Sequence, residues 1–206
     1  MVPSLSPNSS PDPVVFLDRD GVINRDSPAY VKSLAEFEFL PRSLSAIQKL
    51  AENHIKTIVI TNQSAINRGL ISQQTLESIH TSMTTEVRVR GGTIDDIFYC
   101  PHTPQEGCTC RKPAPGMIHS ARMKHSIDLS FAGMVGDSAK DIACARRAQV
   151  RYAVLVKTGN VDKAQQELHD LNLQPDRVAQ DLYAAVEWIV EQFQTSNQRP
   201  PAGPEV

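Results

Sequence analysis

The chain has 206 residues, a length typical of one compact domain, or of one domain with a small insertion. Apolar residues make up 40% of it and charged residues 21%, which excludes collagen-like, coiled-coil and wholly disordered chains. The formal net charge is only -2, so electrostatics gives no reason to expect nucleic acid or an anionic membrane surface as a partner.

Short apolar runs alternate with segments of helical periodicity between residues 13 and 194, which we interpret as one domain. Strands are predicted at residues 14–17, 57–61, 97–100, 132–135 and 152–156. Helices are predicted after Pro41, after Ser72, from about Gly116, from Ser138 to about Ala148, and along a stripe from Leu182 to Phe193. The proline-rich ends, residues 1–12 and 195–206, offer too little apolar surface to fold, and we expect them to be disordered.

The order of these elements predicts the fold class. Strands that are apolar throughout are covered on both faces, and their alternation with helices favours an α/β doubly wound three-layer sandwich around a central, mostly parallel sheet. The segment between residues 20 and 61 has room for one helix and its connections, so no large cap domain is expected. Ligands of such sheets bind at the C-terminal ends of the strands, and we expect the chemistry there.

Polar side chains stand directly after three of the predicted strands. Asp18 and Asp20 follow the first strand, Thr61 ends the second, and Asp137 follows the fourth, while Lys112 lies in a basic turn before a predicted helix. Singly, each has an ordinary structural interpretation as an acidic turn, a helix cap or a solvated basic turn. Together, the three carboxylates suit a hard cation such as Mg²⁺, and Thr61 and Lys112 suit the oxygens of a phosphoryl group.

Three of the four cysteines cluster with a histidine. The cluster consists of Cys100, His102, Cys108 and Cys110. Three thiolates and one imidazole complete a tetrahedral zinc set with no open position, which predicts a small structural zinc-binding loop at residues 100–110. This loop ends at Arg111 and should therefore hold Lys112 in place. No apolar run is long enough to span a membrane and the N-terminus is not a secretory signal, so we expect a cytoplasmic protein.

The chain resembles the haloacid dehalogenase-like phosphohydrolases, whose four motifs are matched by DRDG, TNQ, RKP and GDSAKD between about residues 14 and 159. The resemblance implies that Asp18 attacks phosphorus to form an aspartyl-phosphate and that Asp20 is the general acid and base. It also implies a Mg²⁺ ion bound by Asp18, by the backbone carbonyl of Asp20 and by Asp137. Thr61 and Lys112 would then bind the phosphoryl oxygens.

Within that group, the chain is similar to the D-glycero-D-manno-heptose 1,7-bisphosphate 7-phosphatase family. The similarity lies in FLDRDGVIN, ITNQSAINRG, YCPH, CTCRKPAPGM and MVGD. It implies removal of the C7 phosphate in the biosynthesis of ADP- or GDP-heptose precursors, with a small phosphorylated sugar as the partner, and we expect a monomer. The substrate contacts that it implies are Asp26, Tyr30, Asn62, Gln63, Ser64 and Arg111.

The nearest alternative is histidinol-phosphate phosphatase, which shares the catalytic motifs and the zinc loop. The stretch TNQSAINRG favours the heptose enzymes over it. The decision between the two depends on this resemblance, because no spacing argument identifies a sugar.

Two further alternatives belong to other functional classes. A phosphoacceptor signalling domain also combines clustered aspartates with a threonine and a lysine, but it keeps its phosphoryl group, and Asp20 argues against that. A zinc-dependent nucleic-acid binder would use the basic stretch RVRGG at residues 88–92 together with Arg146 and Arg147. The net charge of -2 and the 5% of aromatic residues, however, leave neither a basic face nor a stacking platform.

Overall fold

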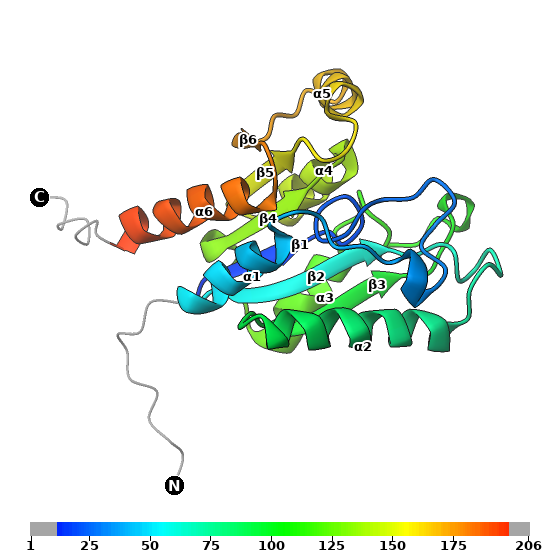
Figure 1. Cartoon of the computed structure of the whole chain (residues 1–206). Coiled ribbons are helices and arrows are strands. Elements are labelled where there is room, and N and C mark those ends of the chain that lie inside the picture. Colours follow the sequence, from blue (N-terminus) through cyan, green and yellow to red (C-terminus); the bar gives the residue numbers. More distant parts are fainter. Residues whose placement is uncertain (1–11, 198–206) are drawn as a thin grey trace, which may run out of the picture.

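The computed structural model describes residues 12–197, and its centre is a sheet of six strands. The strands are β1 (Val14–Leu17), β2 (Lys56–Asn62), β3 (Asp96–Cys100), β4 (Ala132–Gly136), β5 (Tyr152–Val156) and β6 (Arg177–Ala179). Their spatial order is β3-β2-β1-β4-β5-β6, and every neighbouring pair is parallel (Figure 1). The strand order reverses between β1 and β4, which is the point where open parallel sheets bind their ligands.

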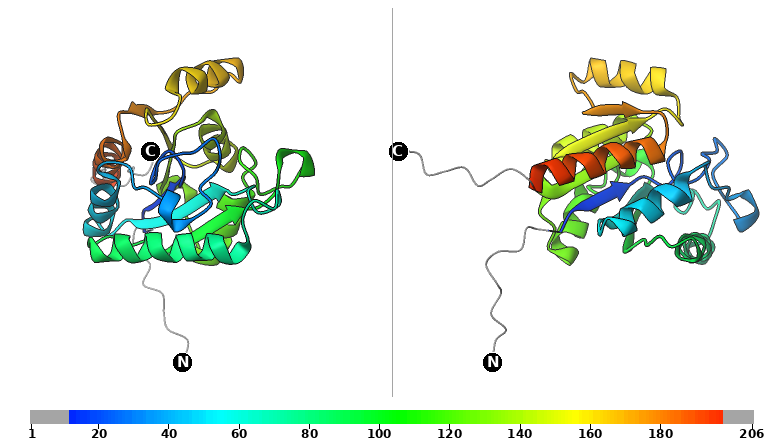
Figure 2. Two further views of the ribbon diagram at one scale, coloured as in Figure 1. Left: turned by 45° about the vertical axis from the view of Figure 1, so that its right-hand side comes forward. Right: turned by 60° about the vertical axis from the view of Figure 1, so that its left-hand side comes forward.

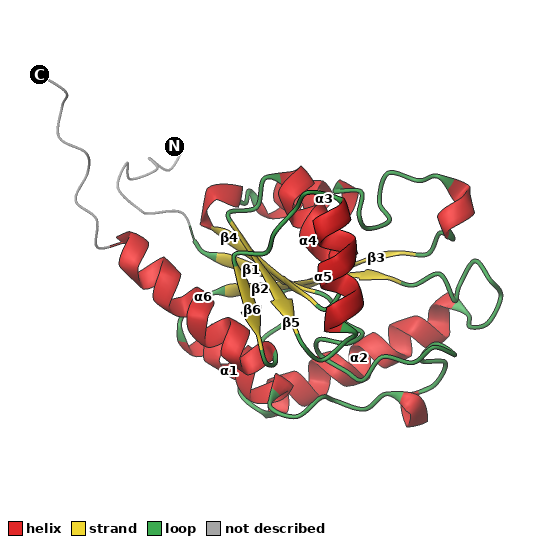
Figure 3. Ribbon diagram, turned by 90° about the horizontal axis from the view of Figure 1, so that it is seen from above, coloured by secondary structure: helices red, strands yellow, loops and turns green. Residues whose placement is uncertain are grey.

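Helices cover both faces of the sheet. They are α1 (Ser43–Glu52), α2 (Gln73–Val89), α3 (Gly116–His125), α4 (Ala139–Ala148), α5 (Val161–Asp170) and α6 (Leu182–Asn197). Three short 3-10 helices lie at Leu34–Glu36, Pro104–Glu106 and Leu129–Phe131. The helices α1, α2 and α6 lie on one side of the sheet and α3, α4 and α5 on the other (Figures 2 and 3). This three-layer arrangement confirms the predicted α/β doubly wound fold.

The apolar runs pack as strands that are buried on both faces. In β1, Val14 and Phe16 belong to the core beneath α3 and α4, whereas Val15 and Leu17 belong to the core beneath α1 and α6. All four side chains are at most 1% exposed. Successive residues of a strand point to opposite faces, so only an uninterrupted apolar run can fill both cores.

Two predicted helix starts are confirmed by their caps. The Ser72 hydroxyl accepts a hydrogen bond from the backbone N–H of Thr75 at 3.0 Å and caps α2. Ser138 caps α4, where its backbone N–H and its hydroxyl donate to the Asp141 carboxylate at 3.1 and 2.6 Å. The second cap matters for the site because it fixes the orientation of Asp141.

The structure also departs from the prediction. Helix α5 and strand β6 were not predicted from the sequence. The second tail was predicted to begin at residue 195, but α6 continues to Asn197, and the Thr195 hydroxyl donates to the Glu191 carbonyl one turn back at 2.8 Å. The rest of both predicted tails, residues 1–11 and 198–206, lies outside the described residues.

The chain enters and leaves the fold at the edge of the sheet where the strands begin. Strand β1 starts at this edge (Figure 1). The end of α6 lies there too, because the Gln194 amide donates at 3.3 Å to Asn53, which comes three residues before β2. Between Asp20 and the start of β2 at Lys56 the chain forms only α1, one 3-10 turn and their connections, so this segment holds no large cap, as expected. Among the described residues, no helix is both long and apolar enough to cross a membrane.

Candidate active site

The predicted site residues meet at the C-terminal ends of the central strands. Asp18 follows β1, Thr61 lies near the end of β2, Lys112 lies in the loop after β3, and Asp137 follows β4. Because β1 lies between β2 and β4, three of these segments are neighbours at one edge of the sheet. The structure therefore places the predicted site residues at the strand ends, as expected from the sequence.

Lys112 forms the centre of a buried charge cluster. Its side chain is 2% exposed, and its ammonium nitrogen lies 2.8 Å from Oδ1 of Asp18 and 2.6 Å from Oδ1 of Asp141. It also donates to the Ile60 carbonyl at 3.0 Å, so the cation is fixed on three sides. Asp141 was not predicted as a site residue, although the second aspartate of GDSAKD, one helical turn after Asp137, was a signal for it.

Asp137 brings a third carboxylate into contact with this cluster. Ligand oxygens of Asp18, Asp137 and Asp141 all lie within 4.8 Å of one another, against the single positive charge of Lys112. Burial raises the pKa of Asp18 to about 7, although the Lys112 charge acts to lower it. Burial, followed by the charges of Asp18 and Asp141, raises the pKa of Asp137 to about 8. Oxygen ligands with this excess of negative charge fit a hard divalent cation such as Mg²⁺.

Two glycines make room for the Asp137 carboxylate. A Cβ atom on Gly21 would lie 2.1 Å from Oδ2 of Asp137, and one on Gly159 would lie 2.4 Å from the same oxygen. Gly21 also has a φ of +79°, a backbone conformation that residues with side chains rarely adopt. The two turns therefore clamp Asp137 only because neither carries a side chain.

The Asp20 carboxylate is held by hydrogen bonds from three side chains. Arg19 donates to both of its oxygens, at 2.8 and 2.9 Å, while Asn24 donates at 2.9 Å and Gln63 at 2.7 Å. Burial acts to raise the pKa of Asp20, but the Arg19 charge and these hydrogen bonds outweigh it and lower that pKa below its ordinary value. Sequence reasoning did not identify Arg19 as a functional residue.

These groups surround one polar cavity of about 340 Å³. All of the predicted catalytic and substrate residues line it, together with Asp137. The cavity wall includes Asp18, Asp20, Asp26, Tyr30, Thr61, Asn62, Gln63, Ser64, Arg111, Lys112, Asp137, Ser138, Lys140 and Asp141. The fold thus brings the dispersed predicted residues together in a single site.

Three of the predicted substrate contacts already bond to other parts of the site. The Asn62 side chain accepts from the backbone N–H of Lys112 at 3.0 Å and donates to its carbonyl at 3.2 Å. The Gln63 amide nitrogen donates to Asp20 and, at 2.9 Å, to the Thr61 hydroxyl. The Arg111 guanidinium donates to the His102 carbonyl at 2.9 Å. In this structure Asn62 therefore holds Lys112 and Gln63 holds Asp20, while Arg111 holds the loop at His102.

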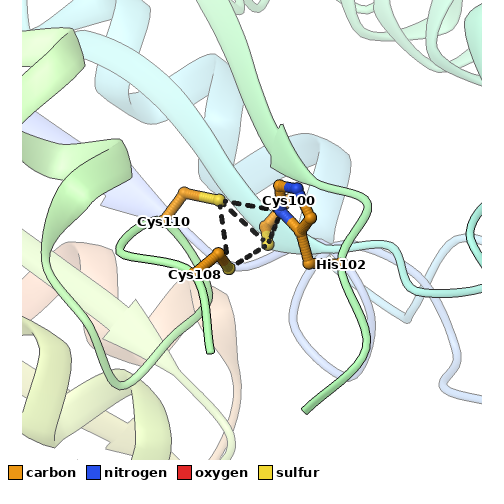
Figure 4. A group of neighbouring side chains, drawn as sticks. All are labelled: Cys100, His102, Cys108 and Cys110. Carbon is orange, nitrogen blue, oxygen red and sulfur yellow. Dashed lines mark hydrogen bonds between the residues drawn. The ribbon is translucent and has the colours of Figure 1, made fainter. Parts of the chain in front are cut away.

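The predicted zinc ligands converge beside the site (Figure 4). Sγ of Cys110 lies 3.1 Å from that of Cys100, 3.4 Å from that of Cys108 and 3.3 Å from Nδ1 of His102. None of these cysteines forms a disulfide. Three sulfur atoms and one imidazole nitrogen gathered around one point fit the donor set and the geometry of a closed zinc site.

This cluster is joined directly to the side of the cavity that Arg111 and Lys112 line. Its last ligand, Cys110, precedes Arg111 and Lys112 in the chain, and the Arg111 bond to His102 closes the loop on itself. Asn62 then clamps the Lys112 backbone to the end of β2. A metal in the cluster would therefore stabilise the position of Lys112 without contacting the cavity.

Comparison with known proteins agrees with this site. A family model described as HAD-hydrolase-like matches residues 109–185. The chain is 41% identical to the D-glycero-beta-D-manno-heptose-1,7-bisphosphate 7-phosphatase of Bordetella bronchiseptica, over 87% of this chain and 98% of that protein. It is 38% identical to the D-glycero-alpha-D-manno-heptose-1,7-bisphosphate 7-phosphatase of Photorhabdus laumondii, over 71% of this chain and 84% of that protein.

The fold agrees with a solved structure as well. The crystal structure of D,D-heptose 1,7-bisphosphate phosphatase from B. bronchiseptica, in complex with magnesium and phosphate, superposes with a TM-score of 0.81 at 41% identity. The match covers 87% of this chain and 99% of that one. From the motifs, the fold and these similarities together, the chain belongs to the heptose-1,7-bisphosphate 7-phosphatase family of haloacid dehalogenase-like hydrolases.

Proposed function

We propose that this chain is a Mg²⁺-dependent phosphatase that removes the C7 phosphate of D-glycero-D-manno-heptose 1,7-bisphosphate during the synthesis of nucleotide-activated heptose precursors. The observation that carries the proposal is the meeting of Asp18, Asp20 and Lys112 in one cavity at the strand ends. The similarity to enzymes named for this substrate supports the choice of sugar.

The first chemical step transfers the phosphoryl group to the protein. An oxygen of the Asp18 carboxylate attacks phosphorus, and the bond between phosphorus and the C7 oxygen breaks. Because its pKa is low, Asp20 is a carboxylate in the free protein; it takes a proton from the incoming phosphate monoanion and gives that proton to the leaving oxygen, which departs as the sugar hydroxyl. Lys112 and the Thr61 hydroxyl balance the negative charge on the phosphoryl oxygens, where the electrostatic contribution to phosphoryl transfer is largest.

The second step returns the protein to its starting state. A water oxygen attacks phosphorus, and the bond between phosphorus and Asp18 breaks. Asp20, now a carboxylate, takes the proton from that water and passes it to the departing inorganic phosphate, so Asp20 is again a carboxylate at the start of the next cycle.

Two metal ions complete the proposal. The side chains of Asp18 and Asp137 and the backbone carbonyl of Asp20 would hold Mg²⁺, which supplies positive charge beside the phosphoryl oxygens. The solved relative in complex with magnesium and phosphate supports this assignment. Cys100, His102, Cys108 and Cys110 would hold a structural zinc ion.

The remaining cavity wall would bind the rest of the substrate. Asp26, Tyr30 and Ser64 line the cavity beyond the reacting groups and are placed to meet the sugar hydroxyls. Arg111 lies on the same wall and carries the positive charge suited to the sugar or to its second phosphate.

The test is phosphate release in the presence of Mg²⁺ from the α and β anomers of heptose 1,7-bisphosphate and from histidinol phosphate, in parallel. We expect a strong preference for a heptose bisphosphate, and loss of all turnover in Asp18→Asn although that variant still folds. A preference for histidinol phosphate would refute the proposed substrate. Substantial turnover by Asp18→Asn would refute its role as nucleophile.

A further inference from the structure

A buried arginine connects the active site to a histidine outside all of the motifs. The Arg19 side chain is 1% exposed, and its Nη1 atom lies 3.3 Å from Nε2 of His80. His80 belongs to α2, on the side of the sheet away from α3 and α4, and is 8% exposed. No motif includes it, and it comes 61 residues after Arg19 in the chain.

The chemistry of the pair fixes its protonation state. An arginine side chain is always protonated and offers only donors, so Nη1–H donates and Nε2 of His80 accepts. The imidazole is then neutral and carries its proton on Nδ1. Burial, together with the Arg19 charge, lowers the pKa of His80 to about 4, which keeps the ring in this form at neutral pH. The Tyr99 ring packs edge-on against the imidazole, with centroids 6.1 Å apart, and limits its movement.

The other end of the guanidinium sets the orientation of Asp20. Nη2 of Arg19 lies 2.8 and 2.9 Å from the two carboxylate oxygens, and Nε lies 3.2 Å from one of them. A guanidinium is planar and rigid, so the contact with His80 at Nη1 fixes the direction in which Nη2 and Nε point. Arg19 therefore fixes the orientation of the Asp20 carboxylate, which must face the leaving oxygen.

We propose that His80 is a positioning residue that acts through Arg19 to aim the Asp20 carboxylate at the leaving oxygen of the substrate. This inference rests on the proposed function, because it takes Asp20 as the general acid. Without His80, a buried N–H of Arg19 would lose its partner and the guanidinium would turn to find another. Asp20 would then lose its alignment, although neither Arg19 nor Asp20 had been changed.

The experiment separates this role from simple packing by changing the leaving group. With enzyme in excess, release of the leaving group in a single turnover reports only the first chemical step. The C7 oxygen of the heptose bisphosphate needs a proton in that step, whereas the nitrophenolate of 4-nitrophenyl phosphate leaves without one. A misaligned general acid therefore slows the first substrate and spares the second.

Three variants are compared with the wild type under saturating Mg²⁺. His80→Leu removes the acceptor, His80→Gln replaces it with an amide oxygen, and Ile79→Val makes a packing change at the neighbouring buried position of the same helix. For His80→Leu we expect about a tenfold loss of the single-turnover rate on heptose bisphosphate with KM within twofold, and less than a twofold loss on 4-nitrophenyl phosphate. His80→Gln should keep both rates within threefold, and Ile79→Val should keep both unchanged. If His80→Leu does not fold, His80→Ala takes its place.

The outcomes distinguish this inference from the proposed function. A wild-type chain that is inactive on heptose bisphosphate would refute the proposed function. An active wild type with an unimpaired His80→Leu would refute the positioning role alone. Equal losses on the two substrates, or no recovery in His80→Gln, would also refute it, because they would show that His80 only supports the fold.

Discussion

Replacing Gly159 by alanine tests whether the turn after β5 holds Asp137 in place. The backbone at Gly159 is not in the left-handed region, so alanine can adopt it, and the change adds only a methyl group. That methyl would lie 2.4 Å from Oδ2 of Asp137, although such contacts are essentially never shorter than 3.0 Å. The carboxylate must therefore move by at least about 0.6 Å.

The size of that movement sets the expected effect. Catalytic groups must stay within about 0.5 Å of their productive geometry, and a misplacement of about 1 Å can lower a rate by about a hundredfold. We therefore expect Gly159→Ala to lower turnover at a fixed Mg²⁺ concentration by about tenfold or more. The Mg²⁺ concentration that gives half-maximal activity should rise as well, because Asp137 is a proposed ligand.

The assay is phosphate release measured against Mg²⁺ concentration, with the melting temperature recorded for each variant. The matched control is Gly91→Ala, where φ is +81° and the nearest atoms lie 3.7 Å away, far from the cavity. This control should lose about 1–2 kcal/mol of stability to backbone strain and keep its Mg²⁺ dependence. A Gly159→Ala variant with wild-type activity and Mg²⁺ dependence would refute the clamping of Asp137.

Three further predictions concern the charge cluster, the zinc loop and a helix cap. Asp141→Asn removes one of the two carboxylates at Lys112 and should lower the free energy of unfolding by about 3 kcal/mol in urea titrations, since it breaks a buried ion pair; a more stable variant would contradict the pairing. Cys108→Ser should lose bound zinc and melt at a lower temperature, and a wild type without zinc by elemental analysis would overturn the metal assignment. Ser72→Ala should cost about 1 kcal/mol of stability by removing the cap of α2, with turnover unchanged; an undiminished melting temperature would count against the cap.

The two elements that the sequence analysis missed, β6 and α5, bury few residues. The strands at the centre of the sheet are apolar runs because both of their faces are covered, and that pattern can be read without a structure. Strand β6 is three residues long at the edge of the sheet, and only Ala179 of it is buried. In α5 only Ala164 and Leu168 are buried, so its apolar stripe is too narrow to stand out.

The site residues likewise fall into those that local sequence predicts and those that it does not. Residues such as Asp18 and Asp137 could be placed because parallel strands end at one edge, so their position follows from local sequence alone. The contacts of Asn62 with Lys112 and of Gln63 with Asp20 could not be predicted, because they depend on which groups lie side by side once the chain has folded. His80 carries no local signal at all, since its contact with Arg19 exists only after α2 has packed against the sheet.

The position of the first strand's start and the last helix's end has a practical consequence. The start of β1 and the end of α6 lie at the edge of the sheet opposite the cavity (Figure 1). Anchoring the protein to a resin, an electrode or a fusion partner at the start of β1 or the end of α6 would thus leave the entrance of the cavity open to solution. In a tethered cascade, a second enzyme fixed to the same support could hand its product to this chain across open solvent.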